Sequence, residues 1–271
     1  MQYASFEQFL TVSRGLQAVT INGYMGSIKR MQKALGENPT HEQLNFYIQN
    51  LYSSAYSYAH KINTALALER WTEYKGNPIR FGRQRKPKQT IKDTLTEAEV
   101  TRLIFNSESK RDKAMIALLS YSGCRNLELC KLRVSDFDPG RNSVRIIKGK
   151  GIKDGLCNIS SDCTKILLEY IQEYCLNRDD FLFYTYQKKQ MTTSAVRKQV
   201  KKAARLAGIT KRVYPHLLRH SLACNLLLRG ANIVLLKNQL RHSMLETTMT
   251  YINSIVFESM SDYQKFSPSY I

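Results

Sequence analysis

The sequence from residue 240 to residue 251 reads Leu-Arg-His-Ser-Met-Leu-Glu-Thr-Thr-Met-Thr-Tyr. It places His242 nine residues before Tyr251. Three shorter pieces, each centred on arginine, lysine or histidine, precede it in this order: Gly123-Cys-Arg-Asn-Leu-Glu-Leu129, Gly149-Lys-Gly151 and His216-Leu-Leu-Arg-His220. The second half of the chain therefore carries a phenol, three arginines, a lysine and imidazoles in one ordered set.

These side chains are the ones that breaking a phosphodiester requires when no metal takes part. The reaction needs a nucleophile, cations that neutralise the charge on the phosphate oxygens, a base, and an acid for the departing 5′ oxygen. A lone arginine or histidine usually belongs to a solvated face or to the core, and most of the sixteen tyrosines must serve packing or the surface. The order and spacing of the whole set favour a catalytic interpretation, because three of only five histidines fall inside two short motifs.

The ordered set resembles the signature of the tyrosine recombinases, the family of phage integrases and Xer proteins, over roughly residues 95–260. The run from Ser122 to Leu129 is similar to Thr-Gly-Leu-Arg-x-x-Glu-Leu, and the final stretch is similar to His-Ser-x-x-x-Thr-Thr-x-x-Tyr. Two residues depart from the pattern. Cys124 replaces a common leucine, and Arg241 stands where a glycine usually precedes the second histidine. Neither change removes a catalytic group, and Arg241 either contacts DNA or points to solvent.

The resemblance implies a role for each matched residue, and no metal or cofactor. The catalytic residues would be Arg125, Lys150, His216, Arg219, His242 and the nucleophile Tyr251, with Glu128 and His220 in support. A free phenol has a pKa near roughly 10, so the tyrosine needs a nearby base and positive charge, for which His216 and the arginines are suited. The arginines would donate forked hydrogen bonds to the non-bridging oxygens, and His242 would donate a third.

The lysine of the Gly-Lys-Gly turn would protonate the leaving 5′ hydroxyl. Lys148 and Lys153 flank Lys150, so the choice of Lys150 rests on the alignment with that turn. Rejoining would run the same chemistry backwards, with the bond energy held in a 3′-phosphotyrosine. The enzyme implied is a tyrosine site-specific DNA recombinase. The alternatives are a type IB topoisomerase-like DNA relaxase and a catalytically silent DNA-binding regulator of the same fold.

The net charge supports a nucleic-acid partner. The chain has 271 residues with 41 Lys and Arg against 22 Asp and Glu, which gives a formal charge of +19. A surface so positive attracts a polyanion and releases its counterions. A solubilising surface or attachment to an acidic membrane would also fit the charge, but no lipidation motif and no basic cluster beside a hydrophobic anchor is found. We expect double-stranded DNA as the partner, and no membrane.

Local patterns predict two domains. Apolar residues recur at helical spacing in the first eighty residues, and Thr40 with Gln43 fits a capping box. We expect residues 1–82 to form a helical, SAM-like core-binding domain, residues 83–93 a basic linker, and residues 94–271 the catalytic domain with its C-terminal tail. A second capping box is predicted at Thr96 and Glu99. One β-hairpin is predicted from residues 143–147 and 156–159 around a glycine-rich turn.

The expected fold is mainly helical with a small β-sheet, and the resemblance implies that the two domains form a C-shaped clamp around DNA. It also implies a homotetramer on two DNA sites, in which the tail, with Ile255, Val256 and Phe257, docks into a neighbouring subunit. Docking against its own core is the alternative. Chromosome dimer resolution, element integration or excision, and the use of accessory factors all stay open.

The N-terminus lacks a basic segment followed by a long apolar core, so a cytoplasmic location is expected. The six cysteines are interpreted as reduced and mostly buried, because the two pairs with five intervening residues do not fit the usual zinc spacing.

Overall fold

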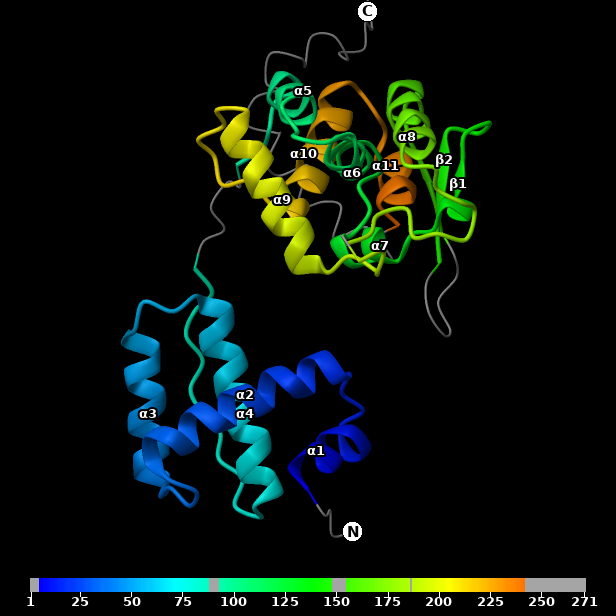
Figure 1. The fold of residues 1–271 in the computed structure, drawn as a ribbon. Helices are drawn as coiled ribbons and strands as arrows, with labels where there is room; N and C mark the ends of the chain where they lie inside the picture. Colours follow the sequence, from blue (N-terminus) through cyan, green and yellow to red (C-terminus); the bar gives the residue numbers. More distant parts are fainter. Residues whose placement is uncertain (1–4, 88–92, 148–154, 186, 242–271) are drawn as a thin grey trace, which may run out of the picture. The chain divides into compact units, whose positions relative to one another are not determined.

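The structure is a computed structural model that describes residues 5–87, 93–147, 155–185 and 187–241. The chain divides into two compact units, Met1–Thr90 and Ile91–Ile271. Figure 1 shows the helices of the first unit in blue and cyan, and the elements of the second in green to orange.

The described part of unit 1 is helical. Its elements are α1 (Phe6–Gln8), the π-helix η1 (Phe9–Ser13), α2 (Ala18–Leu35), α3 (His41–Ser53) and α4 (Tyr58–Tyr74). The predicted capping box is confirmed: Thr40 N donates to Gln43 Oε1 at 2.8 Å, and Gln43 N donates to Thr40 Oγ1 at 3.3 Å. These bonds satisfy two backbone donors that the first turn of a helix leaves unpaired, so α3 begins where the sequence predicts.

The core of unit 1 forms where α2 packs against α4. Met31 of α2 and Leu68 of α4 have no exposed surface. The segment that follows α4 belongs to the same core, because Ile79 and Phe81 are also buried in it. Burying each large apolar side chain contributes roughly 1.5–3 kcal/mol, so this segment is held to the helices by packing.

Unit 2 contains seven described α-helices and three short strands within residues 93–147, 155–185 and 187–241. The helices are α5 (Glu97–Phe105), α6 (Lys110–Ser122), α7 (Asn126–Lys131), α8 (Ser161–Glu173), α9 (Thr193–Leu206), α10 (Pro215–Leu228) and α11 (Ile233–Leu240). The second predicted capping box is confirmed: Thr96 and Glu99 exchange hydrogen bonds of 2.8 and 3.2 Å at the start of α5.

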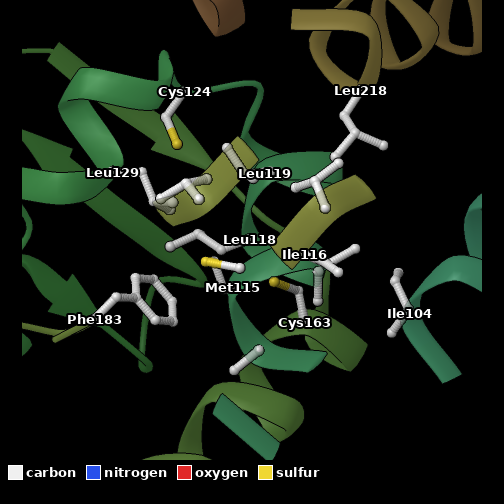
Figure 2. Close-up of a cluster of buried hydrophobic side chains, with 14 of the residues drawn as sticks. Ile104, Met115, Ile116, Leu118, Leu119, Cys124, Leu129, Cys163, Phe183 and Leu218 are labelled. Atoms are coloured by element: carbon white, nitrogen blue, oxygen red, sulfur yellow. The ribbon is translucent and has the colours of Figure 1, made fainter. Parts of the chain in front are cut away.

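Helix α6 is the centre of unit 2. All six residues from 114 to 119 have no exposed surface, and the helix packs against α5, α8 and α10. A helix that is apolar on every side is stable only when other elements surround it. Figure 2 shows Met115 and Leu118 of this helix among side chains from other elements, including Leu129 and Phe183. The end of α6 is therefore a rigid point from which the next residues are positioned.

The small sheet has the order β1-β2-β3, with both pairs antiparallel. The strands are β1 (Phe137–Asp138), β2 (Ser143–Ile146) and β3 (Gly155–Asn158), and the short 3-10 helix η2 (Val134–Asp136) precedes them. Pairing of Val144 with Cys157 confirms the predicted hairpin. The mainly helical fold with a small sheet is confirmed as well, although β1 is a strand that the sequence did not predict.

Five of the six cysteines are buried and Cys175 is exposed, which confirms that most of these thiols are buried. Within the described residues, no cluster of three or more His, Cys, Asp or Glu side chains could hold a metal ion. No helix among those residues is both long enough and apolar enough to span a bilayer.

Candidate active site

The candidate site is built around Gly123, which ends α6. Its φ of 62° is in the left-handed region, where glycine avoids the clash that a Cβ causes. A Cβ at this position would lie 2.8 Å from Leu240 Cδ2 and 2.9 Å from Leu222 Cδ2. Both the backbone turn and the close approach of α10 and α11 therefore require glycine here.

Arg125 follows this turn and begins α7. Its backbone N donates to Glu128 Oε2 at 2.7 Å, and its Nη1 donates to Glu128 Oε1 at 3.0 Å. The carboxylate thus caps the helix and holds the guanidinium from one side. The Arg125 side chain is still 46% exposed, so its other donors can reach a ligand in solution.

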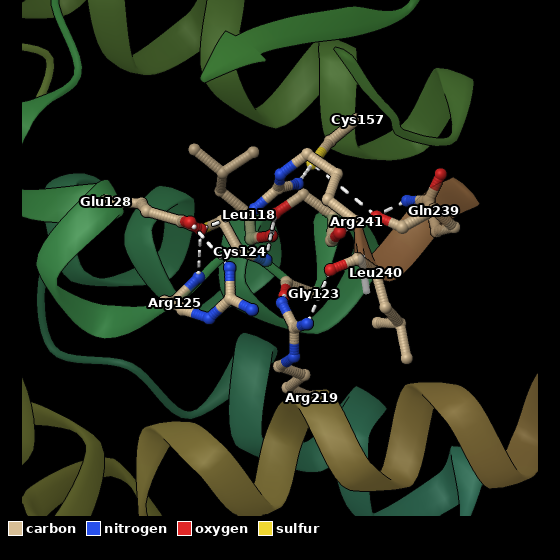
Figure 3. A network of polar contacts seen from close by, with 11 residues as sticks. Leu118, Gly123, Cys124, Arg125, Glu128, Cys157, Arg219, Gln239, Leu240 and Arg241 are labelled. Carbon is tan, nitrogen blue, oxygen red and sulfur yellow. Dashed lines mark hydrogen bonds and ion pairs between the residues drawn. The ribbon is translucent and has the colours of Figure 1, made fainter. Parts of the chain in front are cut away.

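Arg219 lies on α10 and is the largest fully buried side chain among the described residues. Its Nη1 donates to the carbonyl oxygen of Gly123, and its Nη2 donates to that of Leu240 at 2.5 Å. It therefore connects the end of α6 to the end of α11. Figure 3 shows the guanidinium groups of Arg125 and Arg219 beside the Gly123 turn, so the structure brings these two sequence-predicted arginines into one place.

The two histidines of the His-Leu-Leu-Arg-His motif differ in their surroundings. His216 is exposed, whereas His220 is only 4% exposed and its Nε2 lies 4.0 Å from Cys224 Sγ. His216 precedes Arg219 by three residues on the same helix, a spacing that places both on one face. An imidazole open to solvent can accept a proton from a ligand, while the buried His220 contributes to the packing of α10.

Two residues of the site, Gln239 and Arg241, were not assigned a role from the sequence. Gln239 donates from Nε2 to Ser122 O at 3.1 Å and to Asn158 O at 2.7 Å, and it accepts from Asn158 N at 3.2 Å. Its amide therefore connects α11 to both α6 and β3. Its only sequence signal is a glutamine beside the Leu-Arg-His motif.

Of the two arrangements considered for Arg241 from the sequence, pointing to solvent is wrong. Its side chain is 6% exposed, and its Nη2 donates to Glu128 Oε2. Its Nη1 donates to the sulfur of Cys157. The backbone of Arg241 is left-handed, with φ at 52°, and its side chain lies against Cys157 of β3 and Glu128 of α7.

The ionisation of the groups under the site follows from burial. Burial acts to raise the pKa of Glu128, but the backbone hydrogen bond from Arg125 and the charge of Arg241 outweigh it, so its pKa is lowered. Burial raises the pKa of Cys124 to about 12 and that of Cys157 to about 11. At neutral pH the site therefore holds one carboxylate and two uncharged thiols beside three guanidinium groups.

Lys150, His242 and Tyr251, three of the residues predicted to be catalytic, lie outside the described residues. The strands β2 and β3 that flank the segment containing Lys150 are described, and so is Arg241, the residue before His242. The described part supplies the exposed guanidinium of Arg125 and an exposed imidazole, groups that can bind an oxyanion and transfer a proton. Arg219 is buried, and its two Nη atoms donate to backbone carbonyl oxygens.

The chain is similar to known proteins over most of its length. Residues 93–256 match the model of the phage integrase family. A tyrosine recombinase of Pseudothermotoga lettingae is 31% identical and aligns with 97% of this chain and 94% of its own length. The tyrosine recombinase XerA of Pyrococcus horikoshii is 30% identical over 80% of this chain and 76% of its own.

Solved structures resemble the fold. A XerH site-specific recombinase bound to a palindromic difH substrate has a TM-score of 0.71 at 23% identity, and covers 98% of this chain and 85% of its own. A lambda integrase dimer bound to a COC′ core site has a TM-score of 0.70 at 16% identity, covering 91% of this chain and 74% of its own.

Proposed function

The chain belongs to the phage integrase family of tyrosine recombinases, and from this premise we propose that it cuts DNA through a covalent 3′-phosphate bond to Tyr251. It is a site-specific DNA recombinase, and we propose double-stranded DNA as its substrate. Its residues must therefore attack a phosphodiester, stabilise the transition state, and reverse the reaction on a second strand.

The proposed cleavage step balances in atoms and charge. The Oη of Tyr251 forms a bond to the scissile phosphorus while the bond from phosphorus to the 5′ oxygen breaks. His216 takes the phenol proton, and Lys150, which is protonated at neutral pH, gives a proton to the 5′ oxygen. Arg125 and Arg219 donate to the non-bridging oxygens, and His242 donates a third hydrogen bond. Attack by a 5′ hydroxyl on the phosphotyrosine then restores a phosphodiester.

The observation that supports this proposal is that Arg125 and Arg219 both lie at the Gly123 turn, where α6 ends. Arg219 bonds to the carbonyl oxygen of Gly123, two residues before Arg125, although 96 residues separate them along the chain. His216 is exposed on the helix that carries Arg219. A phosphate reaching Arg125 would therefore lie near a second guanidinium, that of Arg219.

Incubation with labelled duplex that carries a nick at a candidate site tests the proposal. The nick lets the cut fragment diffuse away, so the covalent product accumulates and appears as a retarded band on a denaturing gel. Tyr251→Phe should abolish the band, and Tyr263→Phe, a matched change in the same tail, should keep it. If wild type forms no adduct on a site that it binds, the catalytic proposal is wrong.

Two other functions are less favoured. A type IB topoisomerase-like relaxase would share the chemistry, but the relatives named above are recombinases. A silent DNA-binding regulator would not need the complete set of matched residues. Exchange of strands between two labelled duplexes separates recombination from relaxation, which needs only one duplex.

We further propose that residues 1–82 bind one face of the DNA as the core-binding domain, that residues 94–271 catalyse the reaction, and that four copies act on two sites in the cytoplasm. The expected C-shaped clamp would result from the two domains on opposite faces of the duplex.

Apolar residues of the tail, including Phe257, would dock into a neighbouring copy. A truncation after Asn253 should then still bind one site but fail to form a complex of two duplexes on a native gel. Unimpaired pairing would contradict docking in trans.

A further inference from the structure

Arg241 has a backbone conformation that favours glycine. It ends α11 with φ at 52° and ψ at 48°, where the Cβ of an L-residue crowds the following carbonyl oxygen. Such a conformation persists only where surrounding contacts hold it. Its side chain is 6% exposed, so a permanently charged group has also been removed from water. Both costs indicate that the contacts of this side chain matter to the site.

These contacts join segments that are distant in sequence. Arg241 donates to Glu128 of α7, 113 residues away, and to Cys157 of β3, 84 residues away. Figure 3 shows the side chain of Arg241 between Glu128 and Cys157. Gly155 leaves the space for it, because a Cβ at Gly155 would overlap Cδ of Arg241. One guanidinium thus fixes the end of α11, the hairpin and α7 against one another.

Glu128 is shared between two cations. Its Oε2 accepts from the backbone N of Arg125 and from Arg241, while its Oε1 accepts from Nη1 of Arg125. The charge of Arg241 offsets part of the attraction that Glu128 exerts on the Arg125 guanidinium. Without Arg241, the carboxylate would hold Arg125 as its one remaining cation, in competition with a phosphate ligand.

We infer that Arg241 is a positioning residue for strand cleavage, a role that rests on the proposed function. It acts through Glu128: from the buried side it neutralises the carboxylate and fixes its place, so that Glu128 orients Arg125 without binding it too strongly to engage the scissile phosphate. This differs from the roles in catalysis assigned above, because Arg241 acts here on Glu128 and not on the phosphate itself.

Two single substitutions test this inference from opposite directions. Arg241→Gly removes the guanidinium and relieves the backbone. Gly155→Ala keeps every charge but displaces the Arg241 side chain, and the φ of Gly155 is outside the positive region, so its backbone accepts alanine. Gly140→Ala is the matched control, because its Cβ would lie 3.5 Å from the nearest atom, an ordinary contact.

The measurements are the first-order rate of adduct formation on the nicked duplex at saturating protein, and the Kd for the same duplex from gel shifts. Arg241→Gly and Gly155→Ala should each lower the rate by on the order of tenfold to a hundredfold, as misplacement of a catalytic group does. The Kd should stay unchanged, because many other phosphate contacts contribute to it. Arg241→Lys should give an intermediate rate, since lysine has no fork to reach both partners.

The combination with Glu128→Gln decides whether Arg241 acts through Glu128. In that background Arg241→Gly should cause no further loss of rate, whereas a role in packing alone predicts the same loss in both backgrounds and would overturn the inference. A wild-type rate in Arg241→Gly would overturn it as well. If wild type forms no adduct, the proposed function fails first and this inference fails with it.

Discussion

Both units contain a glutamate that accepts hydrogen bonds from two arginines and one backbone N–H, yet the two clusters do different work. In unit 1, Glu69 of α4 accepts from Phe81 N at 3.0 Å, from Arg83 at 2.8 Å and from Arg80 at 3.2 Å. The Glu69 side chain is 1% exposed, while its arginine partners are 71% and 40% exposed. The buried carboxylate therefore holds the segment after α4 to the helix.

In unit 2 the buried member of the cluster is an arginine. Arg241 is 6% and Glu128 is 13% exposed, while Arg125 is 46% exposed. Arg241 holds the Glu128 carboxylate from its buried side. The carboxylate in turn orients the Arg125 guanidinium, which is exposed to solvent. A glutamate, two arginines and a backbone N–H thus stabilise a chain segment in unit 1. In unit 2 the same kinds of group present a cation that can bind a ligand. The buried partner, rather than the number of ion pairs, therefore decides what such a cluster does.

The largest effect should follow from Glu69→Ala. The change leaves Phe81 N–H without its acceptor and opens a cavity in a buried site, and we expect a loss of about 3 kcal/mol in the free energy of unfolding after allowance for the exposed arginines. Trp71, the single tryptophan of the chain, is buried on α4, so its fluorescence during urea unfolding reports on unit 1. An unchanged urea midpoint in Glu69→Ala would mean that the buried carboxylate does not hold this segment to α4.

Glu128→Ala should affect activity more than the stability of unit 1. The Arg125 guanidinium loses its orienting partner, and we expect adduct formation on nicked DNA to slow by on the order of tenfold or more. The Trp71 transition in urea should stay at its wild-type position, because the substitution is in the other unit. The two variants could instead lose the same stability and both cleave DNA normally. That result would show that Glu69 and Glu128 do not differ in role.

The pH dependence of stability sharpens the role of Glu128. Because its folded pKa is lowered, its contribution is fully present above the ordinary carboxyl value of about 4.3 and is lost as pH falls through the folded pKa. The difference in unfolding free energy between wild type and Glu128→Gln should therefore shrink below about pH 4. Urea unfolding followed by circular dichroism from pH 7 to pH 3 measures it. A difference that stays constant would exclude the ion pairs as its cause.

The smallest effect should come from Arg80→Ala. The Arg80 side chain is 71% exposed, so water screens its bond to Glu69, and Arg83 keeps the carboxylate paired. We expect a loss of about 0.5 kcal/mol in the free energy of unfolding by the Trp71 signal. A loss as large as that of Glu69→Ala would mean that the exposed arginine, and not the buried carboxylate, holds the segment.

Local signals in the sequence predicted the helices and the hairpin well. The capping boxes at Thr40 and Thr96 involve residues three positions apart, so a short stretch of sequence is enough to predict where these helices begin. The strand β1 was missed because its two residues have no pattern of their own. Phe137 becomes a strand residue only through pairing with Val144.

The residues of the site likewise separate into those that the sequence identified and those that it did not. Spacing within short motifs identified Arg125, Arg219 and His216, and the structure brings the first two to one turn. The roles of Gln239 and Arg241 could not be predicted, because their partners lie 81 to 117 residues away and only the fold brings them together. The left-handed backbone of Arg241 did leave one signal, because a glycine usually stands at this position.

The crowding at Gly123 has a consequence for how such a chain can change by mutation. Any side chain there meets three obstacles at once: a positive φ, Leu240 at 2.8 Å and Leu222 at 2.9 Å. A smaller residue at either leucine removes one obstacle and leaves the left-handed backbone. A substitution at Gly123 should therefore be better tolerated after Leu222 or Leu240 has become smaller, so the order of such mutations matters.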